Sequence, residues 1–318
     1  MRFIPNFSGF DFFPHGTHID FMRFRDICFW GSVALIILSL GLFAVRGLNY
    51  GVDFKGGTMI EVQTASGAPA DIQGMRTRLG GLGLGDVQIQ EFGASNDVLI
   101  RVEQQPGDEA AQQVALKKVL DTLGGEYIQR RVEVVGPAVS AELRRTGLIA
   151  VVAAIMAIIL YVWFRFEWQF AAGTILSLVH DVTVVVGIFS LFQMEFDLGI
   201  VAALLTILGY SVNDTVVVSD RIRENLRKYK RMELRELLNL SINETLSRTI
   251  LTGVTTIVML LALFVFGGSV IRYFALAMLL GVLIGTYSSI FIAAPILEIL
   301  GVKRETVTGG SEKAAARS

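Results

Sequence analysis

The chain has 318 residues, of which 53% are hydrophobic and only 18% are charged, and its mean hydropathy is +0.57. Soluble domains carry about one charged residue in four, so this composition excludes an ordinary soluble protein and indicates an integral membrane protein. The net charge of −1 identifies no class of partner, and the single cysteine, Cys28, excludes an intramolecular disulfide and a Cys-x-x-Cys site.

Six segments are long and apolar enough to be membrane helices, since about 20 apolar residues cross a bilayer core of about 30 Å. They are 27–45, 147–164, 169–192, 198–219, 248–266 and 273–297. A polar segment, 1–26, precedes the first span. The apolar stretch of this span is too long for a cleavable signal, so we expect an anchored helix. The sequence therefore predicts a membrane all-α bundle of six transmembrane helices.

Lys and Arg are distributed unevenly over the short segments that flank the spans. Four segments on one side, with sixteen Lys and Arg residues in total, are 1–26, 165–167, 220–248 and 298–318. The two short loops on the other side hold only Arg272. By the positive-inside rule both termini are cytoplasmic and residues 46–146 are exported, although Arg144 and Arg145 on the outer flank of the second span run against the rule.

The exported segment, residues 46–146, has the composition of a soluble domain. Four stretches are typical of strands, "GGTMIEVQT", "DVQIQEF", "DVLIRVE" and "YIQRRVEVV", and two of helices, "APADIQGMRTRLGGL" and "GDEAAQQVALKKVLDTLG". Their order, β-α-β-β-α-β, predicts an inserted α+β domain with the ferredoxin-like arrangement. Such a domain covers one sheet face with two helices and leaves the other face for a partner, although a passive plug or spacer has the same pattern.

The cytoplasmic side carries a basic segment at 220–247 in which leucine and isoleucine recur at near-helical spacing. It predicts an interfacial amphipathic helix, or a pair of them, and we favour membrane lipid over nucleic acid as its partner. Phe-rich residues 3–24 predict a second interfacial piece, in which His15 and His18 lack the third ligand of a metal site. Residues 298–318 form the cytoplasmic tail.

The sequence contains no nucleotide-binding loop and no nucleophile-and-base motif, so we expect neither an enzyme nor a cofactor. The glycines of 79–85, "LGGLGLG", follow a predicted helix and lead into a strand, a context of turn and cap residues rather than of phosphate binding. Gly281 and Gly285 form a Gly-x-x-x-Gly pair in the last span. This pair predicts close helix packing, either within the bundle or against a second subunit.

Ionisable and amide side chains lie inside the predicted spans, where an unpaired charge is strongly unfavourable. Asn213 and Asp214 lie in the fourth span, His180 and Asp181 at the middle of the third, and Arg248 at the start of the fifth. Because spans three and four are antiparallel neighbours, we expect the His180 and Asp181 pair to share a cavity with Asp214. One interpretation is an ion pair that locks the helices together. We favour a proton relay through these five residues, because Asp214 can take up a proton when Arg248 moves away.

Sequence blocks along nearly the whole chain resemble a known family. They are "NYGVDFKGGTMIEV", "VGPAVSAEL", "VHDV", "GYSVNDTVVVSDRIREN" and "SRTILTGVTT". In this order they resemble the SecF family, the six-span subunits of the bacterial preprotein translocase within the resistance-nodulation-division superfamily. The resemblance implies pairing with SecD, association with the SecYEG channel and YajC, and preprotein export across the cell inner membrane. It also implies that proton flow is the energy source, with no other cofactor.

The resemblance assigns roles to particular residues as well. In the family the fourth-span Asp and the fifth-span Arg belong to the proton pathway, and these positions are Asp214 and Arg248 here. His180 and Asp181 match the third-span motif. Two other classes stay open. A half-transporter proton antiporter for a small molecule would use the same carboxylate, but its relatives usually need two large exported domains. A structural scaffold of the translocon would tolerate loss of Asp214.

Overall fold

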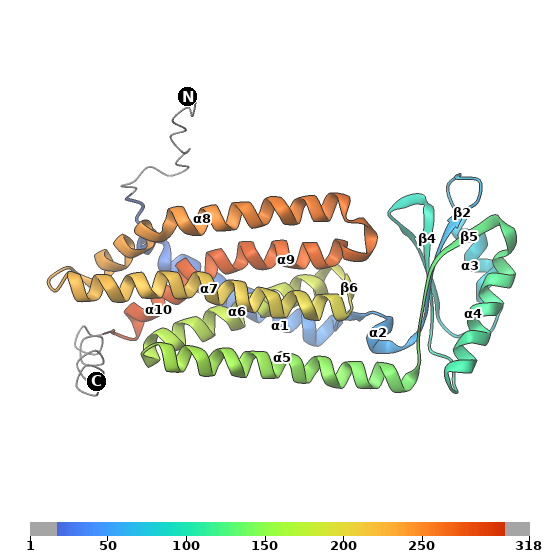
Figure 1. Ribbon diagram of the computed structural model, residues 1–318, viewed down its shortest axis with the longest axis horizontal. Coiled ribbons are helices and arrows are strands. Elements are labelled where there is room, and N and C mark those ends of the chain that lie inside the picture. The colour runs from blue at the N-terminus through green and yellow to red at the C-terminus, as the bar shows by residue number, and fades with distance from the viewer. Residues whose placement is uncertain (1–17, 303–318) are drawn as a thin grey trace, which may run out of the picture.

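The computed structural model describes residues 18–302, leaving aside the side chains of residues 269 and 270. Long helices lie side by side in one bundle, and a small sheet domain stands at one end of it (Figure 1). The tail beyond residue 302 and the first 17 residues, with His15, lie outside the described part of the chain, so the predictions made for them are not addressed by the structure.

Six helices of the described chain are long and apolar enough to cross a membrane, which confirms the six predicted spans. The first five are α1 (Arg25–Arg46), α5 (Pro137–Arg165), α6 (Trp168–Phe192), α7 (Leu198–Lys228) and α8 (Leu234–Phe266). The last has three parts, α9 (Gly268–Ser288), a π-helical turn (Ser289–Ala293) and α10 (Ala294–Ile299). A short 3-10 helix, Phe21–Phe24, leads into α1.

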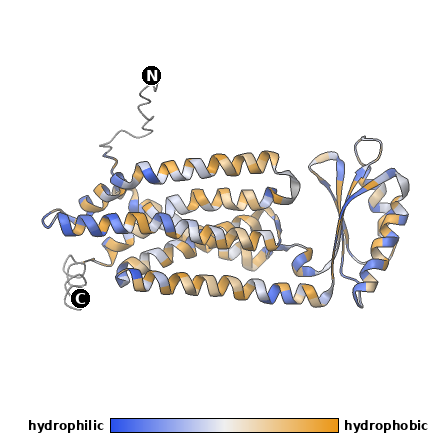
Figure 2. Ribbon diagram, in the orientation of Figure 1, coloured by the Kyte–Doolittle hydropathy of each residue, from blue (hydrophilic) through white to orange (hydrophobic). Residues whose placement is uncertain are grey.

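The bundle has an inner and an outer set of helices. Half or more of the apolar stretch is buried in α6, α7 and the last helix, but less than a fifth of it in α1, α5 and α8. Phe189, Ile207 and Leu208 are among the fully buried side chains of the centre. Apolar residues nevertheless follow the outer helices over most of their length (Figure 2). Their outer faces are therefore suited to lipid or to a membrane partner rather than to water.

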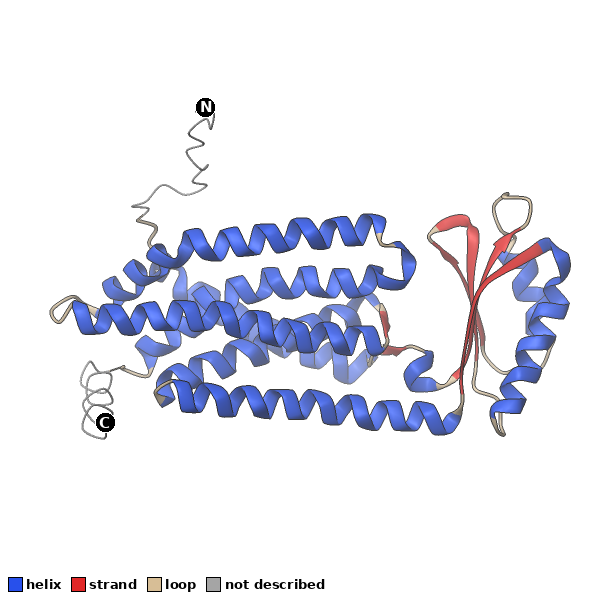
Figure 3. Cartoon of the chain, in the orientation of Figure 1, coloured by secondary structure: helices blue, strands red, loops and turns tan. Residues whose placement is uncertain are grey.

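The sheet domain has four strands and two helices, in the predicted chain order. The strands are β2 (Gly57–Thr64), β3 (Val87–Phe92), β4 (Ala94–Val102) and β5 (Tyr127–Val135), antiparallel in the spatial order β3-β4-β2-β5. Helices α3 (Ile72–Gly80) and α4 (Glu109–Leu123) both cover the face that points away from the bundle (Figure 3). The other face was expected to be free for a partner, but it faces the nearby end of the chain's own bundle.

Local sequence explains where the helices of this domain begin and how the domain is filled. Asp71 accepts a hydrogen bond from the backbone N–H of Gly74, and Asp108 accepts from Ala110 and Ala111, so each carboxylate caps a helix N-terminus. The alternating apolar residues of the strands meet the apolar faces of the helices in one core. Its fully buried members include Ile60, Met75, Leu79, Ile100 and Val119.

The basic segment at 220–247 differs from the prediction. It forms no separate interfacial helix, because α7 continues to Lys228 and α8 begins at Leu234. The two extensions bind each other: the Asn225 amide donates to Ser241 Oγ at 3.0 Å, and Arg221 pairs with Glu244 at 2.7 Å. These contacts join the two extensions to each other, and the predicted contact with lipid stays a prediction.

Candidate functional site

Asp181, at the middle of α6, is completely buried and bound by three side chains. Its Oδ2 accepts hydrogen bonds from Ser211 Oγ of α7 at 2.6 Å and from Ser288 Oγ of α9 at 2.9 Å. Its Oδ1 lies 3.0 Å from Nδ1 of the adjacent His180, which is equally buried. Ser177 extends the group, donating to Ser288 Oγ at 2.7 Å. Asp181 therefore joins three central helices of the bundle.

Asp214 has a different set of partners. Its Oδ1 accepts from Thr249 Oγ1 of α8 at 2.7 Å, and its Oδ2 accepts from Ser289 Oγ of the last helix at 2.6 Å. Both donors are neutral hydroxyls, and the residue keeps 7% of its surface exposed. A carboxylate taken out of water is tolerated only with hydrogen-bond partners, and two hydroxyls supply them here.

Consecutive serines connect the two carboxylates. Ser288 binds Asp181 and Ser289 binds Asp214, at the point where α9 passes into the π-helical turn. Such turns are rare and are found frequently at functional sites. Gly173 of α6 allows the turn to approach, because a Cβ there would lie 2.9 Å from the carbonyl oxygen of Ala293. The last helix thus reaches α6 with one hydroxyl and α7 with the next.

The Gly-x-x-x-Gly pair brings the last helix close enough for these contacts. A Cβ at Gly281 would collide with the side chain of Ile207, and one at Gly285 would lie 3.3 Å from Ser211 Cβ. Both neighbours belong to α7, so within the described chain the predicted close packing is found inside the bundle. Ser288 and Ser289 follow this pair in the same helix.

Arg248 and Asn213 do not join the buried group. Both side chains are exposed, and among residues 18–302 no carboxylate lies within 4 Å of Arg248. The ion pair expected between Arg248 and Asp214 is not formed, because the Arg248 side chain is exposed while Asp214 is buried and bound by Thr249 and Ser289. The cavity expected to be shared by Asp181 and Asp214 is replaced by two hydrogen-bonded clusters joined by the last helix.

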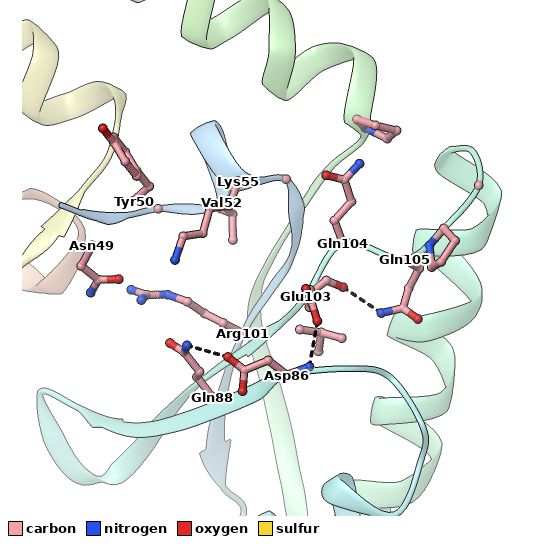
Figure 4. Close-up of a pocket in the computed structure, with 16 residues that line it drawn as sticks. Asn49, Tyr50, Val52, Lys55, Asp86, Gln88, Arg101, Glu103, Gln104 and Gln105 are labelled. Carbon is pink, nitrogen blue, oxygen red and sulfur yellow. Dashed lines mark hydrogen bonds between the residues drawn. The ribbon is translucent and has the colours of Figure 1, made fainter. Parts of the chain in front are cut away.

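A concave feature that the sequence analysis did not predict lies at the end of the bundle that carries the sheet domain. It is a polar cavity of about 600 Å³ between the sheet domain and the segment that leads into it. Figure 4 shows Lys55 and Arg101 extending toward the same part of the cavity. Glu103 at its side accepts from the backbone N–H of Asp86 at 3.0 Å, so its carboxylate already has a partner.

Comparisons with known proteins identify the family to which the sequence is similar. The family described as protein export membrane protein SecD/SecF, C-terminal, matches residues 115–303, and the SecD/SecF GG motif matches residues 41–68. A protein translocase subunit SecF from Cereibacter sphaeroides is 48% identical and is covered over 94% of both chains. One from Escherichia coli O157:H7 is 44% identical, with 92% of this chain and 91% of the relative covered.

Longer proteins match as well. A protein translocase subunit SecDF from Brucella abortus is 46% identical over 93% of this chain and 39% of its own length. The crystal structure of SecDF from Thermus thermophilus superposes with a TM-score of 0.80 at 36% identity, over 90% of this chain and 39% of that one. Since one family model covers more than half of the chain and relatives match nearly all of it, the chain belongs to the SecD/SecF family of protein export membrane proteins.

Proposed function

We propose that the chain uses a proton gradient to drive protein export, with Asp214 as the group that takes up and releases the proton. The burial of this carboxylate among neutral hydroxyls of two other helices is the observation that supports the proposal. A charge that crosses a potential of 100 mV yields about 2.3 kcal/mol, enough to shift a two-state bundle by roughly fifty-fold if coupling is complete. Thr249 and Ser289 hold the ionised form, and protonation weakens their hold on it.

The other relay residues act around this group. His180 and Asp181 form a second polar pair, which Ser288 binds. Ser288 directly precedes Ser289, and Arg248 directly precedes Thr249 in α8. Movement of Arg248 toward Asp214 would favour the ionised carboxylate, and its retreat would favour proton uptake. Asn213 borders the same stretch of α7 from its exposed side.

SecD is the membrane partner that the relatives indicate, since SecD and SecF are joined in one chain in SecDF. On α7 the exposed Asn213 follows the exposed Thr206 and Gly209 at helical spacing, and Arg248 is followed on α8 by the exposed Thr252 and Thr255. Polar residues at membrane depth normally face protein or a water-filled cavity rather than lipid. We assign this face of α7 and α8 to SecD, and include SecYEG, YajC and preproteins as further partners.

Residues 46–146 form the exported domain in this proposal, and the membrane is the cell inner membrane with both chain termini in the cytoplasm. The distribution of Lys and Arg supports this orientation. The spatial strand order β3-β4-β2-β5, with both helices on one face, supports a ferredoxin-like arrangement of the domain.

The decisive experiment is gradient-stimulated export of a slow-folding preprotein in inverted membrane vesicles, with ATP and SecA in excess. Asp214→Asn keeps the size and polarity of the side chain but cannot titrate, so it should assemble with SecD while losing the extra export that a gradient gives. Asp220→Asn is the matched control, because Asp220 lies on the same helix in an exposed ion pair with Arg165. Full stimulation of the Asp214→Asn variant would leave only a structural role for the carboxylate.

A further inference from the structure

The exported domain is bound to the bundle through two very short strands. Strand β1 (Asn49–Tyr50) precedes the domain, and β6 (Glu195–Phe196) lies in the loop between α6 and α7. They pair in parallel, and the backbone N–H of Gly51 adds a 3.0 Å hydrogen bond to the carbonyl of Phe196. The chain entering the domain is therefore attached to the loop that leads into α7.

The start of α7 is bound from the same side. Asp197 accepts a hydrogen bond from the backbone N–H of Ile200 at 3.0 Å, as an N-cap residue does. Asp53, in the short helix α2 (Val52–Lys55) at the entrance of the domain, accepts from the N–H of Leu198 at 3.0 Å. One of the two carboxylates at the N-terminus of α7 thus comes from outside the bundle, where the helix dipole favours negative charge.

These contacts between the entrance of the domain and the start of α7 form a joint, and an ion pair from the sheet completes it. Arg101 of β4 pairs with Glu195 of β6, and each side chain is only 13% exposed. The other charged groups around Glu195 are Asp53, Asp197 and Glu133 of β5. Because Arg131 pairs with Glu133 within β5, Arg101 is the cation that balances Glu195.

We propose that Arg101 and Glu195 are positioning residues that fix the exported domain on the exported end of α7, so that displacement of α7 around Asp214 moves the domain with it. The inference rests on the proposed function of Asp214. Leu198 and Asp214 are sixteen residues apart on one continuous helix, about 24 Å at 1.5 Å per residue. A helix packed on both sides moves largely as a rigid body, so the joint and the carboxylate are mechanically connected.

Charge balance makes the joint testable. In Arg101→Gln, Glu195 remains between Asp53 and Asp197 without its cation, and a partly buried unpaired charge opposes docking. Replacing Glu195 by Gln in the same chain removes that charge, so the double variant should dock again. Loss of a favourable contact alone would make the double variant no better than the single one.

The pH dependence has a defined sign. Burial raises the pKa of Glu195 above its usual range; Arg101 opposes this, while Asp197, Asp53 and Glu133 add to it. A group whose pKa is higher in the docked state binds its proton more tightly there, so acid favours docking and rising pH weakens it. Without Arg101 the pKa of Glu195 rises further. Mild acid on the exported side should therefore restore docking of Arg101→Gln, but it should not change the double variant at this position.

The experiment measures the distance between spin labels on cysteines introduced at Ser95, at the exposed end of β4, and Phe192, at the exposed end of α6. The full chain carries Cys28→Ser and is reconstituted with SecD. A single narrow distance distribution is expected for the parent. Arg101→Gln should increase the undocked population about tenfold, and adding Glu195→Gln should reverse most of that increase. Arg131→Gln is the matched control, because its partner Glu133 lies in the same strand.

The same variants are then assayed for gradient-stimulated export. We expect Arg101→Gln to lose most of the stimulation and the double variant to regain it. Asp214→Asn should leave the distance distribution narrow, so failure of the joint and failure of the proton step give different results. An unchanged distribution in Arg101→Gln would overturn the positioning role. So would full export with an undocked domain, or equal loss of docking in the single and double variants.

Discussion

The two buried carboxylates of the bundle differ in how completely their surroundings enclose them. Asp181 has no exposed surface and is bound by Ser211, Ser288 and His180. Asp214 keeps 7% of its surface and is bound by two hydroxyls. Exposed Asn213 precedes it in α7. A group that exchanges protons needs a route to water or to a partner, and Asp214 has the better access of the two.

His180 adds to the contrast. Its Nδ1 lies beside Asp181, but its buried Nε2 has no hydrogen-bond partner among the described residues. The ring packs against Tyr287, with the ring centroids 6.0 Å apart. An unpartnered buried nitrogen is unfavourable, so the central site holds one unsatisfied polar atom beside a carboxylate that is fully bound. The comparison therefore separates a closed central site from a more open one at its edge.

The largest expected effect comes from separating the last helix from both carboxylates. Gly281→Leu places a branched side chain against Ile207 of α7, where even a Cβ collides. We expect a loss of about 3 kcal/mol in stability, seen as a lower unfolding temperature of the purified chain by tryptophan fluorescence. Gly285→Ala is the control, since its Cβ contact of 3.3 Å requires only a small adjustment. Equal unfolding temperatures would show that this approach does not hold the sites together.

Paired substitutions of the carboxylates test the contrast directly. Asp181→Asn removes a carboxyl group that binds two serines and a histidine in a buried site, so we expect a loss of about 2 kcal/mol in stability. Asp214→Asn affects two hydroxyls that can rotate to bind an amide, so we expect a loss of stability below about 1 kcal/mol. Thermal unfolding of the two variants measures the difference. A larger destabilisation at Asp214 would reverse the assignment of the closed and open sites.

The consecutive serines sharpen the comparison further. Ser288→Ala and Ser289→Ala each remove one hydroxyl donor from a carboxylate, at about 1 kcal/mol. Only Ser289 binds the group that we assign to the proton, so Ser289→Ala should also reduce gradient-stimulated export and shift its pH profile. Ser288→Ala should leave that profile in place. Identical pH profiles for the two variants would mean that the two carboxylates act as one unit.

Much of this architecture was predicted from sequence, and physical reasons separate what was predicted from what was not. Apolar length identified the six spans, and the spacing of apolar residues located the strands and helices of the sheet domain. The ionisable residues inside the spans were recognised as candidate site residues because such residues are rare in apolar segments. Each of these signals is local in the sequence.

The partners of those residues were not predicted, because they depend on how distant helices are rotated. Thr249 binds Asp214 in place of its neighbour Arg248, a difference of one residue and about 100° around α8. The π-helical turn changes the rotation of the last helix, and no residue pattern in the sequence predicts such a turn. Strands β1 and β6 have two residues each, too short for any periodicity, and the pair of Arg101 and Glu195 joins residues 94 positions apart.

The smallest expected effect on the isolated chain is that of Arg248→Met. The side chain is exposed and has no ion-pair partner among residues 18–302, so its loss should change stability by less than about 0.5 kcal/mol. In the complex the same residue lies on the face that we assign to SecD, next to the hydroxyl that binds Asp214. Arg248→Met should therefore lower gradient-stimulated export severalfold, and Arg248→Lys, which keeps the charge, should retain part of it.

Arg227→Met is the matched control, because Arg227 is also exposed but lies in the last turn of α7, away from the carboxylates. Copurification with SecD separates the two ways in which Arg248 acts. If Arg248→Met copurifies normally and loses export, the guanidinium acts on the proton step; if copurification falls in proportion, it acts at the partner face. Destabilisation of the isolated chain as large as that of Asp181→Asn would contradict both, since it would place Arg248 inside the closed site.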